Sequence, residues 1–248
     1  MKRPVIIAHR GSSFTAPENT LASSRVAWAQ DSDAVEVDVY LTTDKQIVCL
    51  HDESTARTTG VDLKIAGASW DQVKGLDAGS WKSERYKREP IPLLESIIES
   101  IPPSKTLFIE IKTKTEIIPR LNEIILSSGK SNQIIFICFD FDTLKSAHAA
   151  MPGIPVMWLF CESKDEITGK RPSLHPSRIK KAHEAGFDAM DVYFECVDPG
   201  VVAACRARGL GLYVWTVYDP EEAGRLFKMG VDGITTNKPD LMLEYFAQ

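Results

Sequence analysis

The fold class that the sequence predicts is α/β, a (β/α)8 (TIM) barrel with a small insertion after its second strand. Short segments rich in Val and Ile alternate with helical patterns along nearly the whole chain, which is typical of a parallel sheet with helices outside it. The length of 248 residues is that of one such barrel. Only residues 52–105 interrupt the alternation, and their apolar content is low. We therefore expect a single domain over residues 1–248, in which the insertion 52–105 does not fold independently and covers part of the cavity mouth.

The individual elements follow from local patterns. The apolar, β-branched character of strands is found at 4–9, 34–41, 47–51, 106–112, 134–139, 155–160, 187–192, 211–216 and 232–236. Helical patterns lie at 17–31, 92–101, 115–129, 142–150, 176–185, 198–208, 220–229 and 239–246. Aspartates stand where helix N-caps are expected, at Asp142, Asp198 and Asp219. Glycines that commonly end a helix follow three of the patterns, at Gly186, Gly209 and Gly230.

The third strand is surplus to an eight-stranded parallel barrel. Only residues 42–46 separate it from the second strand, whereas a parallel crossover takes about a dozen residues or more. The two strands must therefore form an antiparallel hairpin. With Asp44 and Lys45 as a two-residue turn, counting along both strands predicts that His51 lies opposite Asp38. The remaining eight strands are expected to close the barrel.

Composition and charge narrow the classes of partner. The net charge of −5 gives no electrostatic basis for binding nucleic acid or an anionic membrane surface. No segment approaches the ~18 apolar residues that span a bilayer, and the apolar run near the start is too short for a signal peptide. The 5 cysteines include no CxxC pair and lie mostly in apolar runs, as expected of free thiols in a reducing compartment. We expect a cytoplasmic protein without stable membrane insertion.

Two predicted strands show acidic side chains on one face. Glu36 and Asp38 alternate with valines, and Glu110 shares a strand face with Lys112. Three carboxylates that converge on a cavity suit a hard divalent cation with oxygen ligands. The alternative is a salt-bridge network, with Glu36 paired to Lys112 and Asp38 paired to Arg10. Because two cations leave one of the three acids unpaired, and an unpaired buried ion costs several kcal/mol, the cation site is favoured.

Other reactive side chains stand at strand ends, where barrels gather their functional groups. A lone histidine at such a place is commonly a core residue, but His9 and His51 at one cavity can act as general base and general acid. Arg10 and Lys112 can hold phosphate oxygens, or serve only as ion-pair partners. Trp215 either packs in the core or offers an apolar wall to a small polyol. Helix or loop patterns, and hence surface or packing roles, are expected for His148, His175 and His183.

Taken in order, these residues resemble the glycerophosphodiester phosphodiesterase family, within the superfamily of PLC-like phosphodiesterases. The resemblance spans nearly the entire chain, and the ordered set is specific although each motif alone is weak. The matching motifs are His9-Arg10-Gly11, Pro17-Glu18-Asn19-Thr20, Glu36-x-Asp38, Thr43-Asp44, His51-Asp52, Arg57-Thr58-Thr59-Gly60, Gly79-Ser80-Trp81, Ile91-Pro92, Glu110-Ile111-Lys112, Trp215-Thr216-Val217 and residues 230–237.

The resemblance implies metal-dependent hydrolysis of glycerophosphodiesters to sn-glycerol 3-phosphate and an alcohol. By that likeness Glu36, Asp38 and Glu110 bind one divalent cation, Mg²⁺ or Ca²⁺, and His9 and His51 form the acid–base pair. One histidine would deprotonate either water or the neighbouring glycerol hydroxyl, the second route passing through a cyclic phosphate, and the other would protonate the departing alcohol. The expected substrate-binding residues are Arg10, Lys112, Trp215 and Phe139.

Two positions depart from the family pattern, and other functions compete. Ser12 replaces a common glycine and Cys138 replaces a frequent serine. Neither change removes a group that the chemistry needs, but Cys138 bears on how the pocket holds the glycerol or the alcohol. A lysophospholipase D-like enzyme would favour an exposed apolar rim, and the insertion offers only scattered apolar residues. A non-catalytic ligand-binding barrel need not keep every reactive group, whereas this chain has all five: His9, His51, Glu36, Asp38 and Glu110. A sugar-phosphate isomerase would carry a glycine-rich phosphate loop, which residues 232–237 match poorly. A small-molecule substrate is expected, and a homo-oligomeric state is left open.

Overall fold

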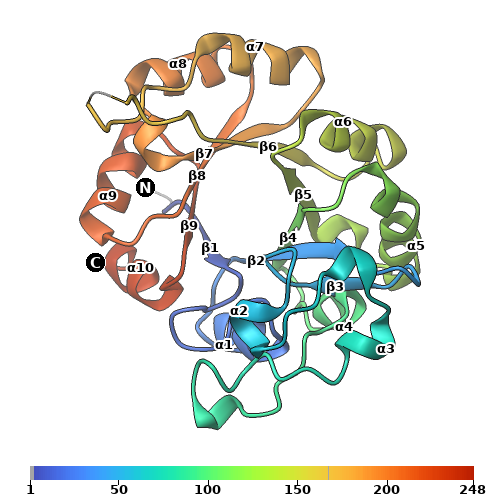
Figure 1. The fold of residues 1–248 in the computed structure, drawn as a ribbon. Coiled ribbons are helices and arrows are strands. Elements are labelled where there is room, and N and C mark those ends of the chain that lie inside the picture. Colours follow the sequence, from blue (N-terminus) through green and yellow to red (C-terminus); the bar gives the residue numbers. More distant parts are fainter. Residues whose placement is uncertain (1–2, 167) are drawn as a thin grey trace.

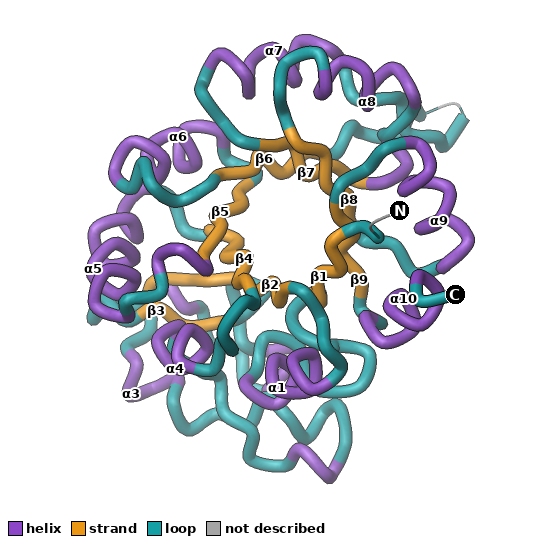
Figure 2. The backbone as a smooth tube through the Cα atoms, turned by 180° about the vertical axis from the view of Figure 1, so that it is seen from behind, coloured by secondary structure: helices purple, strands orange, loops and turns teal. Residues whose placement is uncertain are grey.

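The computed structural model describes residues 3–166 and 168–248, which form a closed barrel of strands ringed by helices (Figures 1 and 2). The strands are β1 (Val5–His9), β2 (Ala34–Leu41), β3 (Ile47–Cys49), β4 (Thr106–Ile111), β5 (Ile134–Cys138), β6 (Val156–Phe160), β7 (Ala189–Tyr193), β8 (Gly211–Trp215) and β9 (Gly233–Thr236). They pair in the order β1-β9-β8-β7-β6-β5-β4-β2-β3, and β1 also pairs with β2, which closes the barrel. Every pair is parallel except β2–β3. The predicted (β/α)8 barrel is confirmed.

Helices cover the outside of the barrel (Figure 1). They are α1 (Leu21–Ala29), α4 (Leu94–Glu99), α5 (Ile118–Ser128), α6 (Phe141–Ala150), α7 (Pro176–Glu184), α8 (Pro199–Arg206), α9 (Pro220–Met229) and α10 (Pro239–Phe246). Asp198 and Asp219 are the N-caps of α8 and α9, as predicted. The N-cap of α6 is Asp140 rather than the predicted Asp142, because the Asp140 carboxylate accepts a hydrogen bond from the first-turn backbone at 2.8 Å.

The strands β2 and β3 form the predicted antiparallel hairpin, but its register differs by one residue from the prediction. The turn holds three residues, 43–45, because Lys45 adopts a left-handed conformation with φ of 62°. Leu50 rather than His51 therefore lies opposite Asp38, and the Leu50 amide donates to the Asp38 carbonyl at 3.0 Å. The prediction of a two-residue turn was wrong.

The insertion 52–105 packs on the outer side of this hairpin (Figure 1). Besides α4 it contains α2 (Ala56–Thr59) and α3 (Trp70–Val73). Its apolar side chains form a small cluster that also includes Val48 and Leu50 of the hairpin. Sharing a core with the barrel supports the expectation that the insertion does not fold independently, and the single-domain interpretation stays a prediction.

The barrel interior is apolar at one end and polar at the other. Its apolar cluster, called the interior cluster below, consists of Ile7, Ala34, Phe108, Ile137, Met157, Leu159 and Ala189. Side-chain alternation puts His9, Glu36, Glu110 and Asp191 two residues further on, toward the carboxyl ends of the strands. Ile7, Ala34, Phe108 and Ala189 of the interior cluster therefore form a floor beneath a layer of polar side chains. Ile137 and Leu159 pair with Glu110 and Asp191 and lie beside that layer. Among the described residues, no helix combines the length and the apolar character needed to cross a membrane.

Candidate active site

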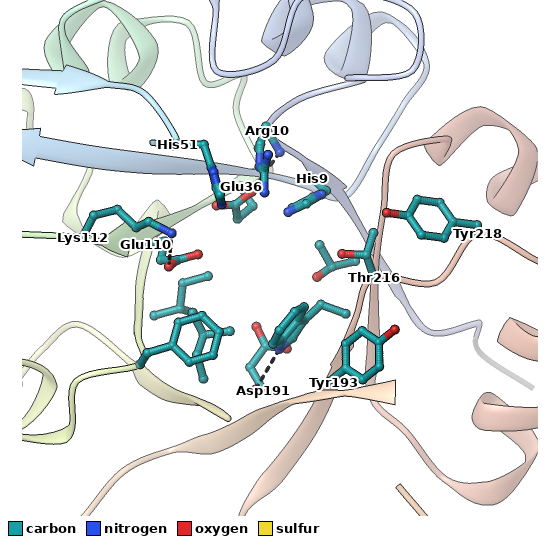
Figure 3. A pocket seen from close by; sticks show the side chains of 15 residues that line it. His9, Arg10, Glu36, His51, Glu110, Lys112, Asp191, Tyr193, Thr216 and Tyr218 are labelled. Carbon is teal, nitrogen blue, oxygen red and sulfur yellow. Dashed lines mark hydrogen bonds and ion pairs between the residues drawn. The ribbon is translucent and has the colours of Figure 1, made fainter. Parts of the chain in front are cut away.

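A cavity of about 400 Å³ lies at the carboxyl end of the barrel (Figure 3). Its lining contains every predicted site residue except Asp38, which is almost fully buried behind the lining. The lining residues are His9, Arg10, Glu36, His51, Glu110, Lys112, Ile137, Phe139, Leu159, Asp191, Tyr193, Trp215, Thr216, Tyr218 and Thr235. Outside this lining lie the three remaining histidines, His148, His175 and His183.

Three buried carboxylates form a cluster in this site. Glu36 and Asp38 face inward from β2, and Glu110 is the β4 residue that pairs with Asp38. One carboxylate oxygen from each residue lies within 4.8 Å of the other two. In the described part of the chain Glu36 Oε1 and Asp38 Oδ1 have no hydrogen-bond partner, although Asp38 Oδ1 forms a longer ion pair with Lys112 at 3.3 Å. A set of hard oxygen ligands with unsatisfied lone pairs fits a divalent cation.

The pKa shifts of the three acids also favour a divalent cation. Burial, and then the charges of Asp38 and Glu110, raise the pKa of Glu36 well above its usual range. Burial and the Asp38 charge raise the pKa of Glu110 to about 7. Burial also acts to raise the pKa of Asp38, but Lys112 and Arg10 outweigh it and the pKa is lowered. Burial and mutual repulsion therefore outweigh the two cations at Glu36 and Glu110 but not at Asp38, and a divalent cation would favour the ionised form of all three acids.

The cations pair with the acids only partly as the salt-bridge alternative predicts. Lys112 Nζ lies 2.8 Å from Glu110 Oε1 and 3.3 Å from Asp38 Oδ1. Arg10 Nε lies 3.3 Å from Asp38 Oδ2, as that alternative predicts. The pair of Glu36 with Lys112 does not form in the described structure, because Lys112 reaches the nearer acid on its own strand. Glu36 Oε2 instead accepts the Arg10 backbone amide at 2.8 Å.

The two imidazoles lie on the same side of the cavity (Figure 3). His9 Nδ1 is 2.6 Å from Asn237 Oδ1, which can only accept, so Nδ1 carries the hydrogen and Nε2 keeps a lone pair. Burial and the Arg10 charge lower the pKa of His9 to about 4, and the ring is neutral at pH 7. His51 Nδ1 is 2.6 Å from Asp52 Oδ1, a carboxylate that can compensate a positive charge on the ring.

Two residues that support the site were missed from the sequence. Residues 17–20 looked mainly like a helix start, and Thr20 is indeed the N-cap of α1. Glu18 Oε1 also accepts a hydrogen bond from Arg10 Nη1 at 3.0 Å. Asn19 Nδ2 donates to Asp38 Oδ2 at 2.8 Å, and Asn19 Oδ1 accepts the Asp38 amide at 3.0 Å. The signal was present, since both residues belong to a motif that carries the family resemblance.

Three rings, Phe139, Tyr193 and Trp215, form an aromatic wall of the cavity. The centroids of Phe139 and Trp215 are 5.5 Å apart and those of Tyr193 and Trp215 are 5.2 Å apart, both in edge-on geometry. Trp215 packs against the interior cluster and also lines the cavity, and its contact with a polyol stays a prediction. Tyr193 and Asp191 were missed, although a lone acid in an apolar strand is a recognisable signal.

Fold and site together define a class, an α/β-barrel enzyme with clustered carboxylates, two imidazoles and two side-chain cations around one cavity. Residues 9–241 match the model of the glycerophosphoryl diester phosphodiesterase family. The chain belongs to this family. The resemblance seen in its motifs is confirmed, as is the prediction that it is an enzyme of the phosphoric diester hydrolase class.

Individual relatives agree with this assignment. A glycerophosphodiester phosphodiesterase of Caldanaerobacter subterraneus subsp. tengcongensis is 30% identical over 246 residues, covering 97% of each chain. A phosphodiesterase structure from Oleispira antarctica, in complex with the product sn-glycerol-3-phosphate, is 29% identical with a TM-score of 0.90, covering 99% of this chain and 98% of that chain. A glycerophosphodiester phosphodiesterase structure from Agrobacterium tumefaciens, at 24% identity and a TM-score of 0.81, covers 98% of this chain and all of its own, and supports the fold alone.

Proposed function

We propose that the protein hydrolyses glycerophosphodiesters to sn-glycerol 3-phosphate and an alcohol, with His9 and His51 as the acid–base pair beside a carboxylate-bound divalent cation. One observation carries the proposal: three buried carboxylates cluster at a cavity that two imidazoles and two side-chain cations also line, and Glu36 Oε1 and Asp38 Oδ1 lack a hydrogen-bond partner among the described residues. Cleavage of a diester needs a proton acceptor and a proton donor, and the anionic phosphate needs positive groups. The product complex of the Oleispira antarctica relative supports glycerol phosphate as the product.

The acidic cluster is the cation site in this proposal. Glu36, Asp38 and Glu110 would hold the ion, Mg²⁺ or Ca²⁺, both of which prefer carboxylate oxygens. Such an ion, when bound, neutralises phosphoryl charge that would otherwise repel a nucleophile. Arg10 and Lys112 bind phosphate oxygens beside the cluster, Arg10 as a planar fork and Lys112 as a point charge.

The surroundings of the two histidines favour different roles. His9 suits the general base, because its Nδ1 hydrogen is held by Asn237 and the neutral Nε2 can accept a proton. It would take that proton from water or from the glycerol hydroxyl next to the phosphate. His51 suits the general acid, because its Nδ1 lies 2.6 Å from Asp52 Oδ1, a carboxylate oxygen that can hold this hydrogen and orient the ring. It would give its proton to the departing alcohol.

Two further parts of the proposal are the contacts to the carbon atoms of the substrate and the cellular compartment. Phe139 and Trp215, which belong to the aromatic wall, would pack against the apolar face of the substrate. The cysteines, Cys49, Cys138, Cys161, Cys196 and Cys205, are free thiols, which supports a reducing compartment and, in this proposal, a cytoplasmic location.

The test is release of sn-glycerol 3-phosphate from glycerophosphodiesters that carry choline, ethanolamine, glycerol or inositol, with Mg²⁺, with Ca²⁺ or with a chelator. We expect release that the chelator abolishes and a divalent cation restores. Hydrolysis that the chelator leaves unchanged would keep the substrate class and refute the cation site. Choline release from lysophosphatidylcholine but not from glycerophosphocholine would favour the lysophospholipase D-like alternative. No hydrolysis of any diester would refute the proposal.

A further inference from the structure

One buried acid of the cavity has no part in the reaction above. Asp191, in the middle of β7, is 2% exposed and belongs to the cavity lining. Its Oδ1 has no hydrogen-bond partner among the described residues. Figure 3 shows its carboxyl group across the cavity from Arg10 and Glu36. An unpaired polar group at this depth costs free energy, and a ligand group that bonds to it would offset that cost.

The chemistry around Asp191 selects the kind of ligand group. Its register partners on β6 and β8 are Leu159 and Tyr213, neither of which is a cation. Burial and the Glu110 charge raise the pKa of Asp191 to about 8, so the carboxyl group is protonated at neutral pH. A protonated carboxyl group offers one O–H donor and an acceptor oxygen. An alcohol hydroxyl also donates and accepts, and it matches this group.

The depth of Asp191 indicates which end of the substrate it meets. Phe139 is 47% exposed and Tyr218 is 55% exposed, so these residues mark the open end of the cavity. The alcohol differs between glycerophosphodiesters whereas the glycerol is shared, and a group of variable size fits best at the open end. The glycerol then lies at the closed end, where Thr235, the β9 register partner of Ile7, adds a hydroxyl group to the lining.

We propose that Asp191 hydrogen-bonds the glycerol hydroxyl furthest from the phosphate and makes the site selective for glycerol over diols that lack this hydroxyl. Asp191 is then a specificity-determining residue that takes no part in proton transfer. This inference rests on the proposed function, because it assigns the glycerol end of the same substrate. It can nevertheless be tested by binding alone, without turnover.

The experiment compares the binding of sn-glycerol 3-phosphate with that of propane-1,2-diol 1-phosphate, which lacks the far hydroxyl, by titration calorimetry in the presence of Mg²⁺. The protein should prefer the glycerol compound about 10- to 100-fold, the usual effect of leaving one buried hydrogen-bonding group unpaired. Asp191→Val should bring the two affinities within about twofold of each other. Asp191→Asn should keep most of the preference, because an amide still donates and accepts.

Two controls separate binding from folding. Asp191→Val removes an unpaired buried polar group, so its Tm should be equal to or above that of the parent protein. Glu184→Val, at an exposed position at the end of α7, should leave the preference unchanged.

Three results would overturn the role of Asp191: no preference in the parent protein, a preference that survives Asp191→Val, or one that Asp191→Asn abolishes as completely as Val does. The last result would mean that charge rather than hydrogen bonding is recognised. A protein that binds with the expected preference but hydrolyses no diester would refute the proposed function and leave the role of Asp191 intact.

Discussion

Replacing Glu110 by Gln should stabilise the cation-free protein at neutral pH while removing its activity. Glu110 lies in the carboxylate cluster, where Asp38 is its paired neighbour on β2. A glutamine has nearly the same shape, and its Oε1 can still accept the hydrogen bond that Lys112 Nζ gives to Glu110 at 2.8 Å. The substitution therefore removes the ionisable group and keeps the local hydrogen bond.

The expected change in the free energy of unfolding follows from the titration of Glu110. Burial and Asp38 hold the pKa of Glu110 at about 7 in the folded protein, against a usual value of 4.5. Between these pH values the folded protein binds more protons than the unfolded chain, so the free energy of unfolding falls as the pH rises from about 4.5 to 7. A pKa shift from 4.5 to about 7 corresponds to roughly 3 kcal/mol, at ~1.4 kcal/mol per pKa unit. Glutamine does not ionise, so the Glu110→Gln variant does not undergo this loss.

The assay is urea unfolding in a chelator at several pH values from about 4.5 to about 8. Glu110→Gln and the parent protein should have similar stability at the acidic end and should differ by about 1–3 kcal/mol in favour of Gln at the alkaline end. Glu116→Gln, at an exposed position after the same strand, should show no such pH-dependent difference. Added Mg²⁺ or Ca²⁺ should stabilise the parent protein more than the Glu110→Gln variant.

A variant less stable than the parent protein at alkaline pH would refute this reasoning. So would a stability difference that does not change with pH. Either result would mean that Lys112 stabilises the Glu110 carboxylate more than burial and Asp38 destabilise it.

The other predictions concern turnover, binding and stability. His9→Ala and His51→Ala should each lower kcat at least ~10²-fold, measured by sn-glycerol 3-phosphate release, and unchanged turnover in both would remove the acid–base roles. Lys112→Met should raise KM about 10-fold through the lost charge-assisted contact to phosphate, and an unchanged KM in steady-state assays would contradict that contact. Asn19→Leu should lower the free energy of unfolding by ~2–4 kcal/mol in urea, because two hydrogen bonds to a buried acid are lost and leucine rarely adopts φ of 56°. A loss below ~1 kcal/mol would argue against a stabilising role of Asn19.

Most of the barrel could be predicted because its strands are buried on both faces and bounded by turns. A segment such as Ala34–Leu41 shows its apolar face through valines at every second position, and it shows the site through the acids between them. The two carboxylates of that strand were therefore predictable as a pair. Their approach to Glu110 also followed, since neighbouring parallel strands bring their carboxyl ends to one edge.

What escaped prediction depends on backbone geometry or distant contacts. The hairpin register was missed because Lys45, a residue with no special preference for it, adopts the left-handed conformation of a three-residue turn. The N-cap of α6 was misplaced because Asp140 and Asp142 both suit that role by type. The partner of His9 is Asn237, which lies 228 residues further along the chain. No local pattern reports such a contact, because it exists only once the barrel has closed.

The interior cluster lies at the closed end of the cavity, so both products of the proposed reaction are expected to leave through the open end that Phe139 and Tyr218 mark. Ile7, Ala34 and Phe108 of this cluster are at most 2% exposed and lie two residues before His9, Glu36 and Glu110 on the same strands, beneath the polar layer. In the proposed reaction the alcohol, at the open end, departs first, and the glycerol phosphate follows by the same path. A second substrate molecule cannot enter until that path has cleared, so accumulated glycerol phosphate should slow the enzyme by competing for entry.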